Sequence, residues 1–417
     1  MGEAGRSTHR PFPLSQERVM TEATPRLATY PLTRERAFDP PDELARRRAE
    51  APIQRMTYAD GHEGWLVTGY AESRAILADN RFSTRPELLH SPIPQRGEFR
   101  GEPLTPGFFL RMDAPAHTRY RRLLTGQFTV RRMKQLEPRI QEITESRLDA
   151  MEREGAPADL VESFALPIPS LVICELLGVP YEDREKFQRD SAVLLNLSSS
   201  MEDIRAAVGD LFSYLHGLVT TKAKEPADDI LSGLVAGGEL TTEEIAGVGL
   251  LLLIAGHETT ANMLGLGTFA LLTNPDQLAV VRDDPAAVEN AVEELLRYLS
   301  IVHIGPTRTA LEDVEVGGAL IRAGESVTLS IGAANRDPER FEGGDALDVT
   351  RPAHGHLSFG HGIHQCLGQQ LARIEMRIAY PALLRRFPNL RLAVPAREVP
   401  LRSNMAIYGV HRLPVLW

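Results

Sequence analysis

The stretch HGHLSFGHGIHQCLG at residues 354–368 decides the fold, and it contains Cys366, one of the two cysteines in the chain. Apolar residues then recur at helical spacing from Leu367 to Ile378, which predicts an amphipathic helix directly after the stretch. The sulfur therefore lies at the amino end of a helix, where free N–H groups and the helix dipole favour an anion. The glycines permit tight turns and a close approach to a flat partner. Ligation of a metal is the leading purpose for such a shielded thiolate.

Residues 359–368, FGHGIHQCLG, resemble the haem-binding signature F-G-x-G-x-H/R-x-C-x-G of the cytochrome P450 monooxygenases. The resemblance implies that Cys366 is the proximal ligand of a haem iron, and that Phe359, Gly360 and His364 belong to the haem-binding residues. A thiolate ligand donates electron density and favours cleavage of the O–O bond.

Two other interpretations of this stretch stay open. His354, His356, His361 and His364 lie near the cysteine in sequence and would offer nitrogen ligands to zinc. A structural zinc site, however, usually needs two or more cysteines or well-spaced pairs. The stretch would otherwise be a glycine-rich turn that carries a buried free cysteine.

The bulk properties limit the class of protein. With 417 residues the chain exceeds the usual size of one domain, yet no linker divides it, so we expect a disordered leader over residues 1–25 and a single domain over 26–417. Two cysteines exclude a disulfide framework and favour a reducing, cytoplasmic location. A net charge of −10 argues against general nucleic-acid binding. No apolar run approaches the length of about 20 residues that a membrane span needs.

Periodicity and turn residues predict the other elements. Helices are expected over residues 41–50 and 71–78, twice within 136–177, and twice within 182–224 with a break near 196–200. Strands are expected as a hairpin within 52–70 and as small hairpins around 314–316 and 327–331. Residues 83–109 lack periodicity. The resemblance implies that 83–109 lies over the haem and that the break near 196–200 belongs to a mobile lid.

A helix is expected to begin after Asp113, which we expect to cap it. His117 and Arg121 are four residues apart and share one face of that helix. Taken alone, this pair would be a solvated face. The resemblance implies that both hold a haem propionate and that Arg308 is a second propionate-binding arginine.

A long helix is predicted from the capping box of Thr241 and Glu244 to about Thr273. It is apolar nearly all round, so it should run through the core. Its centre, AGHETT at residues 255–260, places a glycine and several polar residues where both are costly. These residues would form a kink or a packing notch if the stretch stood alone.

The same centre resembles the family motif A/G-G-x-D/E-T. The resemblance implies that Ala255 and Gly256 lie against the haem and that Glu258 and Thr259 hold water and relay protons on its distal side. Cleavage of an O–O bond needs protons delivered without flooding the site, which suits these residue types.

Glu294 and Arg297 form an E-x-x-R pair, which alone means little because such pairs are common on helices. Its position between the long helix and the cysteine stretch resembles the family's structural pair. We take Arg351 as the third member, and we expect all three residues to stabilise the fold rather than to catalyse.

We therefore expect a mainly α-helical fold with a small β-rich subdomain, the cytochrome P450 fold, with haem b between the long helix and the cysteine stretch. The resemblance implies a monooxygenase that takes electrons from a ferredoxin and its reductase. Arg131, Arg132 and Lys134 are candidates for docking an acidic ferredoxin, or they form a merely solvated cluster. The alternatives are a peroxide-driven peroxygenase and a non-catalytic haem-thiolate binding protein. The acid–threonine pair argues against both.

The substrate pocket is expected to be aliphatic, since aromatic residues make up only 6% of the chain. Its expected lining, taken partly from the resemblance, is Leu251, Ile254, Ala255, Ile304 and Ile407. Such a lining favours a hydrophobic and fairly large substrate, such as a polyketide, a terpenoid or a sterol-like molecule.

Overall fold

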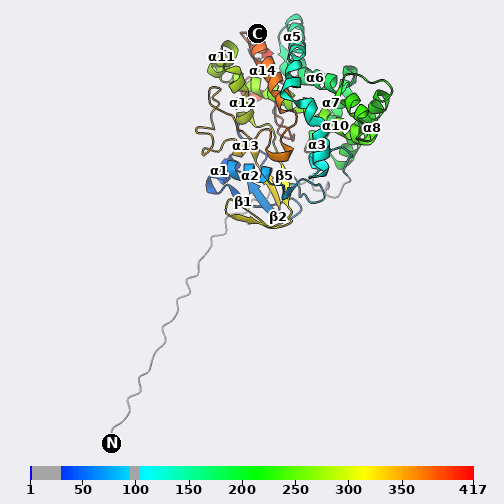
Figure 1. The fold of residues 1–417 in the computed structure, drawn as a ribbon. Coiled ribbons are helices and arrows are strands. Elements are labelled where there is room, and N and C mark those ends of the chain that lie inside the picture. Colours follow the sequence, from blue (N-terminus) through cyan, green and yellow to red (C-terminus); the bar gives the residue numbers. More distant parts are fainter. Residues whose placement is uncertain (2–29, 94–103) are drawn as a thin grey trace.

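The computed structural model describes Met1 and residues 30–93 and 104–417. The leader predicted at residues 1–25 lies outside the described residues except for Met1, and so does part of the segment at 83–109. Figure 1 shows a large helical part and a smaller β-rich part beside it, with the C-terminus in the helical part. This arrangement confirms the predicted mainly α-helical fold with a small β-rich subdomain.

Most of the chain is helical. Three helices belong to the β-rich part or its border: α1 (Asp42–Glu50), α2 (Tyr70–Ala78) and α13 (Ile331–Ala334). The helical part contains α3 (Ala116–Thr125), α4 (Val130–Gln135), α5 (Glu137–Glu154), α6 (Pro167–Leu177), α7 (Arg184–Leu195), α8 (Met201–Lys222), α9 (Ile230–Gly237), α10 (Thr242–Leu272), α11 (Pro275–Asp283), α12 (Val288–Leu299) and α14 (Gln369–Arg386).

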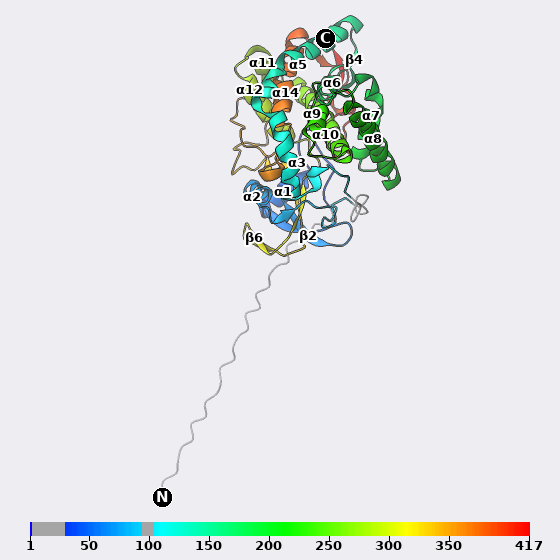
Figure 2. The ribbon, with the colours of Figure 1, turned by 45° about the vertical axis from the view of Figure 1, so that its right-hand side comes forward.

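Helix α10 is the centre of the fold. Its capping box is present, because Thr241 Oγ1 accepts from the N–H of Glu244 while the Glu244 carboxylate accepts from the N–H of Thr241. The helix packs against α6, α8 and α14 (Figure 2). Its leucines join a large hydrophobic cluster that extends through α5, α6 and α14. The predicted long core helix is thus confirmed.

The main sheet has five strands in the order β1-β2-β8-β5-β3. They are β1 (Ile53–Thr57), β2 (Glu63–Val67), β3 (Phe82–Ser83), β5 (Thr307–Ala310) and β8 (Ser326–Leu329). The hairpin predicted within residues 52–70 is confirmed as the antiparallel pair β1–β2. A second sheet joins β4 (Ala158–Asp159), β10 (Pro414–Leu416) and β9 (Arg391–Leu392).

For one predicted strand, the expected pairing partner is wrong. The run at 314–316 forms a hairpin, β6 (Val314–Val316) with β7 (Ala319–Ile321), as expected. Of the run at 327–331, however, residues 327–329 belong to β8, which pairs in parallel with β2 and antiparallel with β5, and Ile331 begins α13. Every residue of β8 is buried. Burial on both faces explains why it takes a central place in the sheet instead of a local hairpin.

The expected cap of α3 is also wrong. Asp113 makes no side-chain cap, and its carboxylate instead accepts from Ser83 Oγ at 2.5 Å and from the N–H of Thr84 at 2.9 Å. Asp113 therefore fastens the segment after β3 to the start of α3. The break predicted near residues 196–200 is confirmed between α7 and α8.

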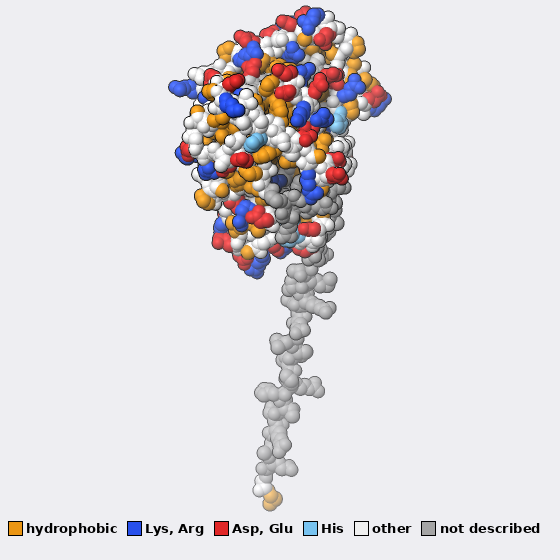
Figure 3. Space-filling view, turned by 90° about the vertical axis from the view of Figure 1, so that its right-hand side faces the viewer, with side chains coloured by type: hydrophobic (Ala, Val, Ile, Leu, Met, Phe, Trp, Pro, Cys, Tyr) orange, Lys and Arg blue, Asp and Glu red, His pale blue; other side chains and the backbone are white. Residues whose placement is uncertain are grey.

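The surface shown in Figure 3 carries acidic and basic side chains intermixed with apolar ones. Across the described part of the chain, every helix falls short of the length or the apolarity that crossing a bilayer demands.

Candidate functional site

Helix α10 is buried from Ile245 to Leu271 except at four residues in its middle. Ile254, Gly256 and Thr259 are half-buried, and Ala255 is exposed. Ala255 and Thr259 are four residues apart and so lie on one face. A core helix that is accessible only along one short strip faces a hollow at that strip, which here begins at Ile254 and ends at Thr259.

The two polar residues of the motif point to different partners. Thr259 lies on the accessible strip, and its Oγ1 donates to the carbonyl of Ala255 at 2.8 Å. Glu258 is buried, and its Oε2 accepts from Arg402 Nη2 at 3.0 Å and from Asn262 Nδ2 at 3.3 Å. The structure therefore places the hydroxyl at the hollow and holds the carboxylate beside an arginine that the sequence did not point out.

The cysteine stretch wraps into a tight loop before α14. The N–H of Cys366 donates to the carbonyl of Phe359 at 2.8 Å, and that of Gly360 donates to Leu357 at 2.8 Å. Gly360 and Gly362 have φ of +68° and +73°, the left-handed region that glycine tolerates. A Cβ on Gly362 would lie 2.2 Å from the carbonyl oxygen of Leu77. The loop is therefore built for glycine at this contact.

The sulfur of Cys366 meets two opposing influences. Burial raises the pKa of the Cys366 thiol, while backbone N–H groups of Gly368 and Gln369 and the guanidinium of Arg121 act to lower its pKa. These N–H groups belong to the start of α14, as the sequence predicted. The residues from 358 to 370 are all half-buried, so the side chains of the loop are not fully covered by other parts of the protein.

Cationic and imidazole side chains gather next to the loop, and within the described part of the chain none of them forms an ion pair with a carboxylate. The rings of His117 and His364 lie 4.2 Å apart, and within the described residues neither ring nitrogen of His117 nor Nε2 of His364 has a hydrogen-bond partner. Burial, then His117 and Arg308, lower the pKa of His364 to about 3. Arg121 Nη2 donates to the carbonyl of Gln365 at 2.5 Å.

Arg308 and Arg111 complete this cluster. Burial, then repulsion from Arg111, lowers the pKa of Arg308 to about 10, and burial also lowers the pKa of Arg111. Both arginines and His364 line a cavity of about 550 Å³. Arg308 is buried, whereas Arg111 is exposed on the side of the cavity that both line. An anion in this cavity would offset the repulsion between the two guanidinium groups. The sequence missed Arg111, because it lies between the aperiodic segment 83–109 and the helix expected after Asp113, and only its place two residues before Asp113 could have suggested a role.

These residues fit a haem. A flat macrocycle with two carboxylates needs an axial donor, a slot and cations at one edge. Cys366, the accessible strip of α10 and the cluster of His117, Arg121, Arg308, His364 and Arg111 offer these three features. Within residues 30–93 and 104–417, no three His, Cys, Asp or Glu side chains are grouped so that they could hold a metal ion, which leaves the zinc interpretation without a ligand set.

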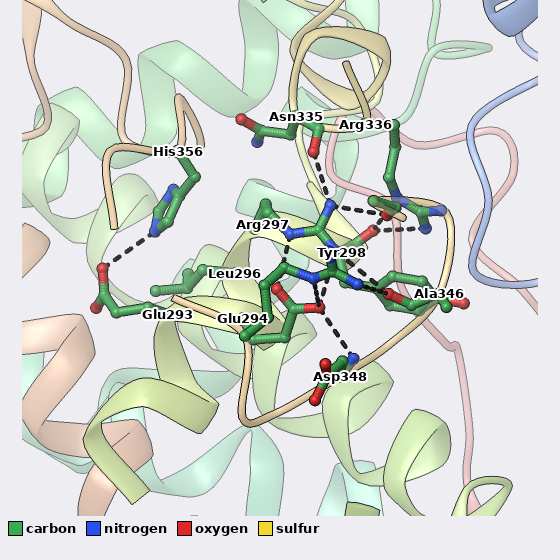
Figure 4. A network of polar contacts seen from close by, with 12 residues as sticks. Glu293, Glu294, Leu296, Arg297, Tyr298, Asn335, Arg336, Ala346, Asp348 and His356 are labelled. Atoms are coloured by element: carbon green, nitrogen blue, oxygen red, sulfur yellow. Dashed lines mark hydrogen bonds and ion pairs between the residues drawn. The ribbon is translucent and has the colours of Figure 1, made fainter. Parts of the chain in front are cut away.

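The E-x-x-R pair lies behind the loop in a dense polar network (Figure 4). Arg297 Nε donates to Glu294 Oε2 at 2.7 Å, and both side chains are fully buried. Arg297 Nη1 also donates to the carbonyls of Asn335 and Gly344, each at 2.8 Å. Arg351 Nε lies 3.4 Å from Glu294 Oε1. The three residues thus fasten α12 to the segment that leads to the cysteine loop.

The aliphatic residues expected at a substrate pocket lie partly together. Ile254 belongs to the accessible strip, while Leu251 is buried one turn before Ala255. Ile304 and Ile407 are half-buried, and a β-bridge between Val302 and Ile407 brings their segments side by side. None of these residues lines the cavity of about 550 Å³.

Comparison with known proteins agrees with this geometry. The family model described as Cytochrome P450 matches residues 286–403. Cytochrome P450 105C1 of a Streptomyces species is 54% identical over 399 residues, which are 95% of this chain and 100% of the relative. Pentalenic acid synthase of Streptomyces avermitilis is 45% identical over 392 residues, 93% of this chain and 97% of the relative. The crystal structure of CYP105P1 in complex with filipin I has a TM-score of 0.89 and 45% identity, and covers 94% of this chain and 99% of that chain.

Proposed function

The chain belongs to the cytochrome P450 family, and from this premise we propose that Cys366 is the axial thiolate ligand of its haem iron. The protein is a haem-thiolate monooxygenase, an oxidoreductase that acts on paired donors and incorporates one oxygen atom. The proposal for Cys366 rests on one observation. The sulfur lies at the amino end of α14, beside the guanidinium of Arg121 and near the His117 and His364 rings, which keep ring nitrogens without partners among the described residues.

The cofactor is proposed to be haem b, held by its two propionates. His117, Arg121, Arg308 and His364 would bind these carboxylates, with Arg111 as an additional donor. Phe359 and Gly360 would lie against one face of the macrocycle, and Ala255 and Gly256 against the other. Charge-assisted hydrogen bonds from arginine side chains suit buried carboxylates. The carboxylates would also give a partner to the ring nitrogens of His117, which lack one in the described residues.

When bound, the haem iron supplies activation of dioxygen and transfer of one oxygen atom to a substrate C–H or C=C bond. Thr259 is proposed to hold a proton at Oγ1 on the open strip of α10. Glu258 is proposed to exchange protons with it through water, and its contact with Arg402 holds the carboxylate in place between exchanges. The apolar residues on both sides of the strip limit the access of other water.

The redox partner is proposed to be a ferredoxin with its reductase. Arg131 and Lys134 are exposed on α4 and Arg132 is half-buried there. Helix α4 packs against α14, the helix that follows Cys366. An acidic partner on α4 would therefore lie on the cysteine side of the haem. A cytoplasmic location is part of this proposal, because two cysteines leave no disulfide framework.

The substrate is proposed to be a hydrophobic small molecule of the polyketide, terpenoid or sterol-like kind. Leu251, Ile254, Ile304 and Ile407 are the proposed contacts. Ala255 on the open strip is small and leaves space above it. The name Pentalenic acid synthase and the complex of CYP105P1 with filipin I show that similar proteins handle secondary metabolites, which supports this class.

Residues 26–417 are proposed to form a single unit. Tyr408 Oη donates to the carbonyl of Ala37 at 2.9 Å, and Arg336 Nη2 donates to that of Phe38 at 3.1 Å. The start and the end of the described chain are thereby fastened to one core.

The test is an optical titration of the purified protein. We expect the ferrous carbon monoxide complex to show the red-shifted Soret band of a thiolate-ligated haem, and Cys366→Ser to lose it. We also expect hydrophobic natural products to shift the ferric spectrum from low to high spin. A wild-type protein without the red-shifted band would contradict the role of Cys366. Turnover with peroxide as fast as with ferredoxin would instead favour a peroxygenase.

A further inference from the structure

A buried carboxylate behind the cysteine loop plays no part in the function proposed so far. Glu293 is 4% exposed and precedes the E-x-x-R pair on α12. Its two oxygens accept from Arg373 Nε at 2.6 Å and Arg373 Nη2 at 3.0 Å, a two-pronged ion pair. His356 Nε2 lies 3.2 Å from Glu293 Oε2, as Figure 4 shows. The carboxylate thus joins α12, α14 and the segment just before the loop.

Arg373 brings this ion pair close to the sulfur. It lies on α14, and its guanidinium carbon lies 4.5 Å from the centre of the Phe359 ring. The carbonyl of Phe359 accepts the N–H of Cys366 at 2.8 Å. Arg373 Nη1 also donates to Gln369 Oε1 at 3.0 Å, at the start of α14. The guanidinium is therefore fixed against the loop that carries the thiolate.

Glu293 is ionised in the folded protein, so it forms a true ion pair with the Arg373 guanidinium. Burial disfavours the charged form of Glu293, but the neighbouring His356 ring and the hydrogen bonds from Arg373 outweigh burial and hold its pKa at about 2. The positive charge of Arg373 acts to lower the pKa of the Cys366 thiol, as does that of Arg121. Arg121 is proposed to be neutralised by a propionate, whereas Arg373 is neutralised by Glu293.

We propose that the Glu293–Arg373 ion pair sets the reduction potential of the haem iron, by fixing how much positive charge acts on the Cys366 thiolate. The inference rests on the role of Cys366 proposed above. Arg373 and Glu293 are positioning residues here, because they act through the thiolate and through Phe359. Reduction adds an electron to the iron and its thiolate, so nearby positive charge favours the reduced form.

Because Glu293 and Arg373 carry opposite charges, removing one or the other should shift the reduction potential in opposite directions. Glu293→Gln keeps the shape of the side chain and leaves Arg373 uncompensated, so the potential rises. Arg373→Met removes the positive charge and leaves a carboxylate, so the potential falls. The double variant removes both charges and lies between the two. We expect each single variant to change the equilibrium constant of reduction by about threefold to tenfold, and tenfold corresponds to about 59 mV for one electron.

The measurement is a spectroelectrochemical titration of the haem-loaded, substrate-free protein at fixed pH and ionic strength. Arg373→Lys keeps the charge and is expected to stay close to wild type. Arg377→Met is the matched control, because Arg377 lies one turn further along α14 and pairs with the exposed Glu289. Arg377→Met should leave the potential unchanged.

Several outcomes would overturn the inference. They are shifts of the two single variants in the same direction, no shift in Arg373→Met, or loss of the red-shifted carbon monoxide band in Arg373→Met and Arg373→Lys alike. The last result would mean that the pair only supports the loop. A wild-type protein without that band would overturn the ligand role of Cys366 itself, and this is a separate result.

Discussion

Glu258 Oε2 lies 3.0 Å from Arg402 Nη2, and this ion pair joins the middle of α10 to a loop near the C-terminus. The same loop is bonded to the junction of α7 and α8. The N–H of Leu197 donates to Asn404 at 2.9 Å, and that of Ala406 donates to Leu195 at 2.8 Å. The C-terminal loop therefore links this junction to the residue that holds the Glu258 carboxylate.

Removal of Arg402 is expected to destabilise the protein and to impair proton delivery. Arg402→Met leaves a buried carboxylate without its cation, which costs about 3 kcal/mol of unfolding free energy. Urea unfolding measures this loss. Product formed per dioxygen consumed should also fall. The double variant with Glu258→Gln should recover most of the stability but not the coupling, and a double variant as unstable as Arg402→Met would contradict this account.

Replacement of Thr259 is expected to separate oxygen consumption from product formation. Thr259→Ala removes the hydroxyl at the open strip but only one hydrogen bond, to Ala255, worth about 1 kcal/mol. Haem content and the melting temperature should change little, while peroxide released per NADPH rises several-fold. Thr259→Ser should restore the coupling. Normal coupling in Thr259→Ala would remove the proposed role of the hydroxyl.

Arg111 is expected to affect the loaded and unloaded protein in opposite ways. Arg111→Met relieves repulsion of Arg308, so the protein without haem should become more stable to urea. Haem affinity should fall about tenfold to a hundredfold, since a charge-assisted hydrogen bond contributes about 1.5 to 3 kcal/mol. Haem titration of the apoprotein measures the affinity. Arg85→Met is the control, because Arg85 lines the same cavity but lies 3.4 Å from the Asp113 carboxylate.

His303 is expected to make stability dependent on pH. Burial, then repulsion from Arg34, lowers its pKa from 6.5 to about 4 in the folded protein. The unfolded chain therefore takes up this proton first as the pH falls. Stability should be lost from about pH 6.5 down to about pH 4, by at most about 1.4 kcal/mol per pH unit, and this contribution should be constant above that range. His303→Gln should flatten this part of the urea midpoint profile.

Gly362 is expected to tolerate no side chain. Gly362→Ala places a Cβ 2.2 Å from the Leu77 carbonyl at a φ of +73°. We expect haem binding to fail and stability to fall by more than about 3 kcal/mol, because backbone atoms must move apart. Gly318→Ala is the control, since Gly318 has a φ of +77° with nothing within 4 Å. It should cost only about 1 kcal/mol. If both variants lost the same stability, the positive φ alone would account for the loss, and the contact with the Leu77 carbonyl would not matter.

The sequence predicted those parts of the molecule whose signals are local. The capping box of α10, the break between α7 and α8 and the cysteine loop each lie within a short run of residues, and each is found where it was expected. The partner of β8 could not be predicted, because strand register depends on β2, far away in the chain.

Several charged residues of the site could not be predicted either, because their partners are also far away in the chain. Arg402 reaches Glu258 only after the C-terminal loop folds back onto α10. Arg373 meets Glu293 across two helices, α14 and α12. Arg111 lies just after the segment 83–109, which has no periodic pattern. An ion pair between distant residues leaves no spacing that a single sequence can reveal.

The order of strands in the main sheet has a consequence for biosynthesis. Strand β8 lies in the middle of the sheet, between β2 and β5, although β1 and β2 leave the ribosome long before it. Until β8 has been synthesised, β2 has an unpaired hydrogen-bonding edge, and its side chains Leu66 and Val67, which are buried in the folded protein, are uncovered. The nascent chain therefore exposes this edge of β2 through most of translation, an interval in which pairing with a wrong strand competes with folding.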